Sequence, residues 1–138
     1  MSILFSYQTP ITIKDATKVK LLLHKVVKAE GFILDTLSIV FTSDEFLYDM
    51  NIKYLHHDYY TDIITFDYSN KKYKLINGEL YISIHRAQEN AKIVKASLQH
   101  ELRRLMVHGL LHLCGYNDTN PSDKVSMSTR EDFYLEKY

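Results

Sequence analysis

The segment from residue 97 to residue 115 constrains the fold most, because its apolar side chains recur at the spacing of an α-helix. Ser97 is a typical N-cap residue and Gly115 is a typical residue just beyond a helix end, so the sequence predicts a helix between them. The second half of this helix is apolar nearly all round, and such a helix has to be buried. We therefore expect it to be the central helix, with the other elements packed around it.

The rest of the chain supplies the elements that cover this helix. Runs rich in β-branched and aromatic residues predict four strands, at residues 3–7, 37–42, 62–68 and 79–84. Apolar residues at helical spacing predict further helices, at about residues 15–29, 43–54, 85–94 and from Pro121 onward. The third and fourth strands should form an antiparallel hairpin, with a lysine-rich tip at 69–74 and a turn at Asn77-Gly78. This order predicts one α/β (α+β) domain over residues 1–138, a mixed four-stranded sheet covered by about five helices.

Composition restricts the classes of function. The 138 residues include 17 Lys and Arg and 17 Asp and Glu, so no net charge attracts nucleic acid, and any RNA contact must come from a local patch. The single cysteine, Cys114, excludes an internal disulfide and suits a reducing compartment. No apolar run approaches the roughly 20 residues of a membrane span, and the first residues lack the pattern of a secretion signal. We therefore expect a cytoplasmic protein without a membrane partner.

Two histidines on the predicted central helix are candidate metal ligands. His108 and His112 are four residues apart, so both imidazoles project from one helix face, with Cβ atoms roughly 5–6 Å apart. Gly115 allows the chain to turn back, which would bring Asp118 to the same ion. Three such ligands leave one position of a zinc ion open. We expect one Zn²⁺ per chain, although the carboxylate would also suit manganese or magnesium.

The run that carries these ligands resembles the signature of a known family. Residues 108–118 read His-Gly-Leu-Leu-His-Leu-Cys-Gly-Tyr-Asn-Asp, and the signature of the YbeY family is His-Gly-x-Leu-His-Leu-x-Gly-Tyr-Asp-His. His108 and His112 match its first two metal histidines, and Asp118 stands where the family usually has its third. The resemblance extends over about residues 40–118. It includes the strand at 78–83 and six matching positions upstream: Asn51, Tyr54, Asp58, Thr61, Asp62 and Phe66.

This resemblance implies a zinc-dependent endoribonuclease of the kind described as bacterial rRNA maturation factors. Its substrate would be single-stranded RNA, in particular the 3′ end of small-subunit rRNA, and it would also act in ribosome quality control. RNA and the ribosome, or its small subunit, are therefore the expected partners. In such an enzyme the zinc polarises a phosphate oxygen and lowers the pKa of a bound water.

One position departs from the family pattern in a way that affects substrate binding. The family's arginine, thought important for activity, falls on Leu55, and leucine cannot bind a phosphate as a guanidinium does. Lys53 and Arg86 are the candidate cations to replace it, and His57 lies in the segment that borders the family's cleft. We therefore predict Lys53, His57 and Arg86 as substrate contacts.

Two other functions also fit the metal motif. A zinc peptidase of the metzincin type has a glutamate directly after the first histidine as general base, but that position is Gly109 here. A non-catalytic, ribosome-associated protein with a structural metal would fit the neutral charge and Leu55. It would need a fourth ligand, and Cys114 is the only nearby candidate. Cys114 lies about 200° round the helix from His112, so it should point away from the ion.

Overall fold

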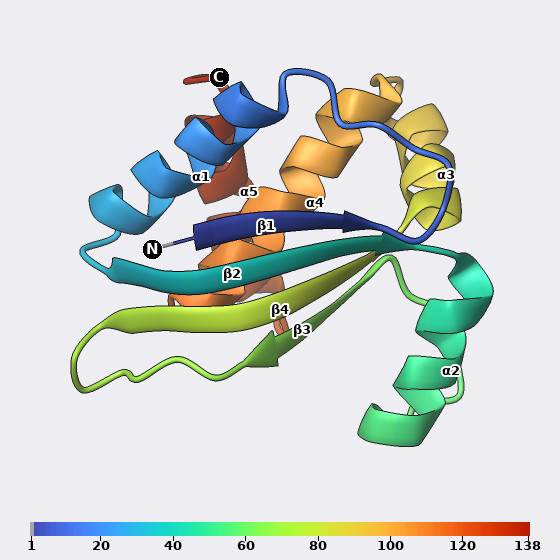
Figure 1. The fold of residues 1–138 in the computed structure, drawn as a ribbon, viewed down its shortest axis with the longest axis horizontal. Helices are drawn as coiled ribbons and strands as arrows, with labels where there is room; N and C mark the ends of the chain where they lie inside the picture. The colour runs from blue at the N-terminus through green and yellow to red at the C-terminus, as the bar shows by residue number, and fades with distance from the viewer. Residues whose placement is uncertain (1) are drawn as a thin grey trace.

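The structure is a computed structural model that describes residues 2–138 and has nine regular elements in that range. In chain order (Figure 1) they are β1 (Ser2–Tyr7), α1 (Ala16–Ala29), β2 (Ile33–Thr42), α2 (Asp44–Leu55), β3 (Ile63–Asp67), β4 (Leu75–Ser83), α3 (Ile84–Val94), α4 (Leu98–Leu113) and α5 (Pro121–Leu135). No helix in this range is long and apolar enough to cross a membrane.

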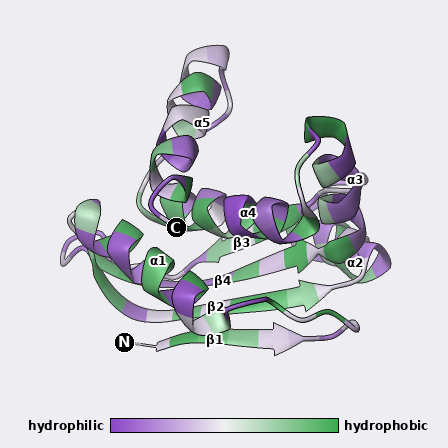
Figure 2. Ribbon diagram, turned by 90° about the horizontal axis from the view of Figure 1, so that it is seen from above, coloured by the Kyte–Doolittle hydropathy of each residue, from purple (hydrophilic) through white to green (hydrophobic). Residues whose placement is uncertain are grey.

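The four strands form one mixed sheet, as predicted, in the order β1-β2-β4-β3. β1 and β4 both pair with β2 in parallel, whereas β3 pairs antiparallel with β4 and so forms one edge of the sheet. Helices α1 and α4 lie against the same face of the sheet, and α5 packs against α4 (Figure 2). The edge strand β3 therefore lies directly beside α4.

Helix α4 is the central helix that the sequence predicts. The Ser97 hydroxyl accepts a hydrogen bond from the His100 amide at 3.0 Å, which caps the helix start, and Gly115 has a φ of 102° just beyond its end. Seven of its apolar side chains are almost completely buried in the hydrophobic core: Leu102, Leu105, Met106, Val107, Leu110, Leu111 and Leu113. The helix contacts α1, α3, α5, β3 and β4, so it touches most of the protein.

The predicted turn at Asn77-Gly78 is wrong, because both residues lie inside β4. A Cβ atom on Gly78 would lie 2.8 Å from the carbonyl oxygen of Phe66 and 2.9 Å from the side chain of Leu113. A glycine stands here because a neighbouring strand and α4 approach the backbone closely, and such close approach, like a turn, favours glycine. The chain reverses earlier, between Asn70 and Leu75, and these two residues form an antiparallel bridge.

Strand β2 begins at Ile33, four residues before the predicted start. Its pairing with β4 shifts in register between Leu34 and Thr36, so the strand contains a bulge. The buried side chains of Leu34 and Leu37 are consequently three residues apart. This spacing breaks the alternation by which a strand is identified from its sequence.

A second glycine brings α4 onto the edge of the sheet. A Cβ atom on Gly109 would lie 2.8 Å from a methyl group of Leu80 and 2.9 Å from one of Ile63. Gly109 follows His108 directly, so its contact with the sheet sets how far the first histidine lies from β3. Gly78 and Gly109 together fix the distance between α4 and the sheet.

We expect Gly109→Ala to lower the free energy of unfolding by about 1–3 kcal/mol, because the added methyl group overpacks a site walled by Leu80 and Ile63. Thermal and urea unfolding of the metal-free protein would measure this. Ser126→Ala, at an exposed position of α5, is the control and should leave stability nearly unchanged. Equal stability of the Gly109 variant and wild type would show that α4 can move away from the sheet at no cost.

Candidate metal centre

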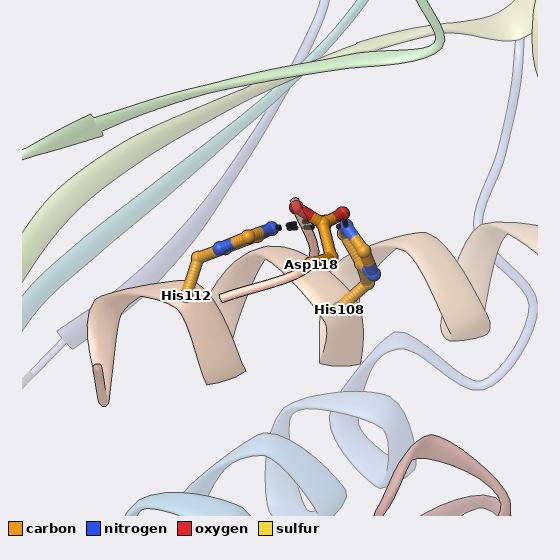
Figure 3. Close-up of side chains that lie close together, drawn as sticks. All are labelled: His108, His112 and Asp118. Carbon is orange, nitrogen blue, oxygen red and sulfur yellow. Dashed lines mark hydrogen bonds and ion pairs between the residues drawn. The ribbon is translucent and has the colours of Figure 1, made fainter. Parts of the chain in front are cut away.

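The structure brings His108, His112 and Asp118 together at one end of α4 (Figure 3). The Nε2 atoms of the two histidines are 3.2 Å apart. One carboxylate oxygen of Asp118 lies 3.3 Å from Nε2 of His108 and 3.5 Å from Nε2 of His112. All three ligand atoms lie within 4.8 Å of one another, so this group could hold a metal ion. The turn after Gly115 returns the chain to the helix, as the motif predicts.

The other ring nitrogen of each histidine faces a group that can only accept a hydrogen bond. Nδ1 of His112 is 2.9 Å from the carbonyl oxygen of Tyr116, and Nδ1 of His108 is 2.6 Å from a carboxylate oxygen of Glu131. These partners assign the proton of each neutral ring to Nδ1, which leaves the lone pair on Nε2. Three acceptors, two lone pairs and a carboxylate, then face one another. Such a donor set fits a cation, and a bound zinc would be ligated in this way.

Glu131 is a functional residue that the sequence analysis missed. It comes from α5, 23 residues after His108, and only 3% of its surface is exposed. Met127, Glu131 and Tyr134 are the buried residues of α5 and share one face of the helix. An acidic residue on the buried face of a helix needs a hydrogen-bond or ion-pair partner, and the position of Glu131 on that face was the signal in the sequence that could have identified it.

The three ligands open into a cavity of about 530 Å³ between α4, β3 and the segment that follows α2. Its other lining residues come mostly from positions 51–67: Asn51, Leu55, His57, Tyr59, Thr61, Asp62, Ile63, Ile64, Thr65 and Asp67. The histidine among the predicted substrate contacts, His57, lines the cavity, whereas Lys53 and Arg86 do not. Arg86 instead binds both carboxylate oxygens of Asp44, at 3.0 and 3.2 Å.

The cavity is acidic. Asp62, Asp67 and Asp118 line it, and across residues 2–138 its wall includes no lysine or arginine. Lys71 reaches the rim through an ion pair with Asp67 at 3.2 Å. Burial tends to raise the pKa of Asp67, but hydrogen bonds from Ser69 and Lys71 outweigh this and lower it. A phosphate group would therefore meet a negative wall unless a cation were bound.

Cys114 does not belong to the ligand group. Its thiol is largely enclosed, and burial raises its pKa to about 12, so it carries its proton at neutral pH. The fourth ligand that a structural metal site requires is therefore not supplied by this residue.

Comparison with known proteins identifies the family of this chain. A family model described as Endoribonuclease YbeY matches residues 6–138. This chain belongs to the YbeY family. The resemblance predicted over residues 40–118 is thus confirmed and extends over nearly the whole chain.

Two relatives, both named Endoribonuclease YbeY, show how similar family members are. The protein of Cytophaga hutchinsonii is 41% identical over 131 residues, which cover 95% of this chain and 91% of the relative. That of Flavobacterium psychrophilum is 37% identical over 134 residues, which cover 97% and 94%.

A solved structure has the same fold. The solution structure of TM1509 from Thermotoga maritima superposes with a TM-score of 0.66 over 98% of this chain and 87% of that protein, at 23% sequence identity. This likeness confirms the predicted fold class, a mixed four-stranded sheet with five helices along the described residues.

We expect purified Cys114→Ala to bind one zinc ion per chain, as wild type should, because the cysteine lies outside the ligand group. His112→Ala should lose most of the bound metal, since two ligands hold zinc poorly. Metal analysis of protein dialysed against zinc would measure both. Loss of zinc from the Cys114 variant alone would indicate a closed, structural site.

Proposed function

We propose that this chain is a metal-dependent endoribonuclease that cleaves single-stranded RNA, with the 3′ end of small-subunit rRNA as its substrate. One Zn²⁺ per chain would be held by His108, His112 and Asp118. The enzyme would act in the cytoplasm, in rRNA maturation and ribosome quality control, with the ribosome or its small subunit as partner. One observation carries the proposal: in a member of a family of endoribonucleases, three side chains that could hold a metal ion lie together in the lining of an open cavity.

In this proposal, some residues of the chain hold the ion and others hold the RNA. When bound, the zinc supplies a Lewis acid that polarises a phosphate oxygen and lowers the pKa of a coordinated water. Glu131 and the Tyr116 carbonyl hold the two imidazoles so that their Nε2 atoms face Asp118. The ligands are between 17% and 37% exposed, so a substrate can approach them from the cavity.

The lining of the cavity favours contact with bases over contact with phosphates. The rings of His57 and Tyr59 are stacked, with centroids 5.1 Å apart, and the Tyr59 hydroxyl lies 2.9 Å from Nδ1 of His57. Tyr59 is 54% exposed, and Leu55 adds an exposed apolar surface. Exposed aromatic rings stack on single-stranded bases, and each such contact is worth about 1–3 kcal/mol. We propose that His57 and Tyr59 hold a base beside the metal, and Lys53 and Arg86 stay predicted contacts of more distant phosphates.

The peptidase alternative meets a steric obstacle. A general-base glutamate would have to replace Gly109, where a Cβ atom alone would lie 2.8 Å from Leu80. The non-catalytic alternative is favoured by one observation, the absence of lysine and arginine from the cavity wall in the described part of the chain. A direct test of RNA cleavage separates this alternative from the enzyme.

The test is cleavage of a single-stranded RNA that carries the small-subunit rRNA 3′ end. Wild type and His112→Ala are purified in parallel and each is reloaded with zinc. We expect wild type to cleave and the variant to lose at least about 100-fold in rate, since a metal site missing a ligand loses its ion or its geometry. Equal cleavage by both proteins would identify a contaminating nuclease. Cleavage by neither, with zinc bound to wild type, would favour the non-catalytic protein.

Leu55→Arg should improve RNA binding, because it would place a cation in a wall that otherwise holds aspartates. We expect the KM for the same RNA to fall about 3- to 10-fold, which corresponds to the net strength of one typical hydrogen bond, about 0.5–1.5 kcal/mol. The matched control is Ile52→Arg, an exposed position of the same helix that does not line the cavity. An equal fall in KM for both variants would mean that overall charge, and not position 55, controls binding.

A further inference from the structure

A chain of hydrogen-bonded polar side chains lies behind His108. Glu131, whose Oε2 contacts the Nδ1 of His108, accepts a hydrogen bond from Nη1 of Arg104 on its other oxygen, at 3.0 Å. The same guanidinium donates to Glu101 through Nε at 2.8 Å and through Nη2 at 2.5 Å. Arg104 thus bridges two carboxylates, one on its own helix α4 and one on α5.

The network continues to the cavity wall. The side-chain amide of Asn90, on α3, donates to Glu101 at 3.3 Å and to Asp62 at 2.9 Å. Asp62 precedes β3 and lines the cavity. Glu101 is therefore held from two sides, and helices α3, α4 and α5 are linked by one set of polar contacts that starts and ends at the cavity.

The burial of this network costs free energy, and a role at the metal site would explain why the protein keeps it. Glu101 is completely buried, Glu131 is 3% exposed, and the side chain of Arg104 is 30% exposed. Removing such charges from water costs several kcal/mol per ion, and apolar side chains of similar volume often give a more stable protein. The hydrogen bonds from Arg104 to Glu101 raise the pKa of Arg104, so its charge is permanent. The two carboxylate groups of Glu101 and Glu131 share this one cation.

The shape of the arginine side chain suits this place. Its planar guanidinium offers donors on several edges, so it can hold Glu101 with Nε and Nη2 while Nη1 reaches Glu131. A lysine ammonium is a single point charge and cannot present this fork. The orientation of Glu131 therefore depends on an arginine at position 104.

We propose that Arg104 is a positioning residue of the metal site. It holds the Glu131 carboxylate so that Glu131 accepts the Nδ1 proton of His108, and the His108 lone pair on Nε2 is then directed at the ion. The direct hydrogen-bond partner of a ligating histidine, here Glu131, contributes about 10- to 100-fold to metal affinity, and Arg104 acts through that partner. This inference rests on the metal site proposed above, and it predicts a metal-affinity role for a residue that touches neither metal nor substrate.

The test measures zinc affinity by competition with a chromogenic chelator. We expect Arg104→Gln to bind zinc about 10- to 100-fold more weakly than wild type. The control is Arg103→Gln, the neighbouring arginine of the same helix, whose guanidinium lies 4.2 Å from the centre of the Tyr138 ring, outside the network. This control should stay within about twofold of wild type. Wild-type affinity in the Arg104 variant would overturn the inference.

A double-variant comparison separates positioning from a general effect on folding. If Arg104 acts through Glu131, then in a Glu131→Ala background the further change Arg104→Gln should alter zinc affinity by less than about threefold. Losses that multiply in the double variant would show that Arg104 acts by another route, and the inference would fall. Circular dichroism and thermal unfolding of the metal-free proteins establish that each variant is folded.

Removing Arg104 leaves Glu101 buried without its cation, so the glutamine variant can fail to fold. Arg104→Lys keeps the charge and loses the fork, and it should still weaken zinc binding about 10-fold.

The wild-type protein offers an independent measurement, because nitrogen-15 NMR identifies which ring nitrogen carries the proton. A neutral His108 protonated on Nδ1 supports the inference, and one protonated on Nε2 overturns it. Failure of wild type to bind zinc at all would reject the metal site itself, together with this inference.

Discussion

The close packing of α4 on β3 and β4 is the constraint on which the site depends. Gly78 on the strand and Gly109 on the helix leave room for no side chain, so the helix rests directly on the sheet edge. His108, beside Gly109, is thereby held at a fixed distance from β3, and the cavity forms between them. Larger residues at these two positions would move α4 outward, and the ligands would separate from the wall that is proposed to hold RNA.

The last helix supplies the support behind both histidines. Glu131 of α5 contacts His108 directly, and the carbonyl of Tyr116 contacts His112. The Tyr116 hydroxyl in turn donates to Glu30 at 2.9 Å, and Arg130 and Tyr134 of α5 bind the same glutamate. The side chain of Glu30, just after α1, is only 8% exposed. Helices α1 and α5 therefore clamp the turn that follows α4, and the geometry of the site depends on residues from both ends of the chain.

Much of the fold, and the convergence of His108, His112 and Asp118, could be predicted from the sequence, because those features follow from local patterns. The apolar spacing between Ser97 and Gly115 identifies a buried helix, and a His-x3-His-x5-Asp pattern identifies ligands that one turn can bring together. The misplaced turn at Gly78 has the opposite origin, since glycine there serves a contact with α4, far away in sequence. Glu131 was missed for the same reason: its partner is 23 residues earlier on another helix, and nothing in the local pattern of α5 names that partner.

The charge of the cavity links the metal to substrate binding as well as to chemistry. Aspartates 62, 67 and 118 line the wall, and Leu55 stands where the family has an arginine. In the part of this chain that the structure describes, no lysine or arginine lines the cavity wall, and Lys71 at the rim pairs with Asp67, so the proposed ion would offset the remaining aspartates when a phosphate approaches. RNA binding and metal binding are then coupled, and each should strengthen the other by the same factor. The stacked pair of His57 and Tyr59 fits this arrangement, because a base held by its flat face needs no positive charge.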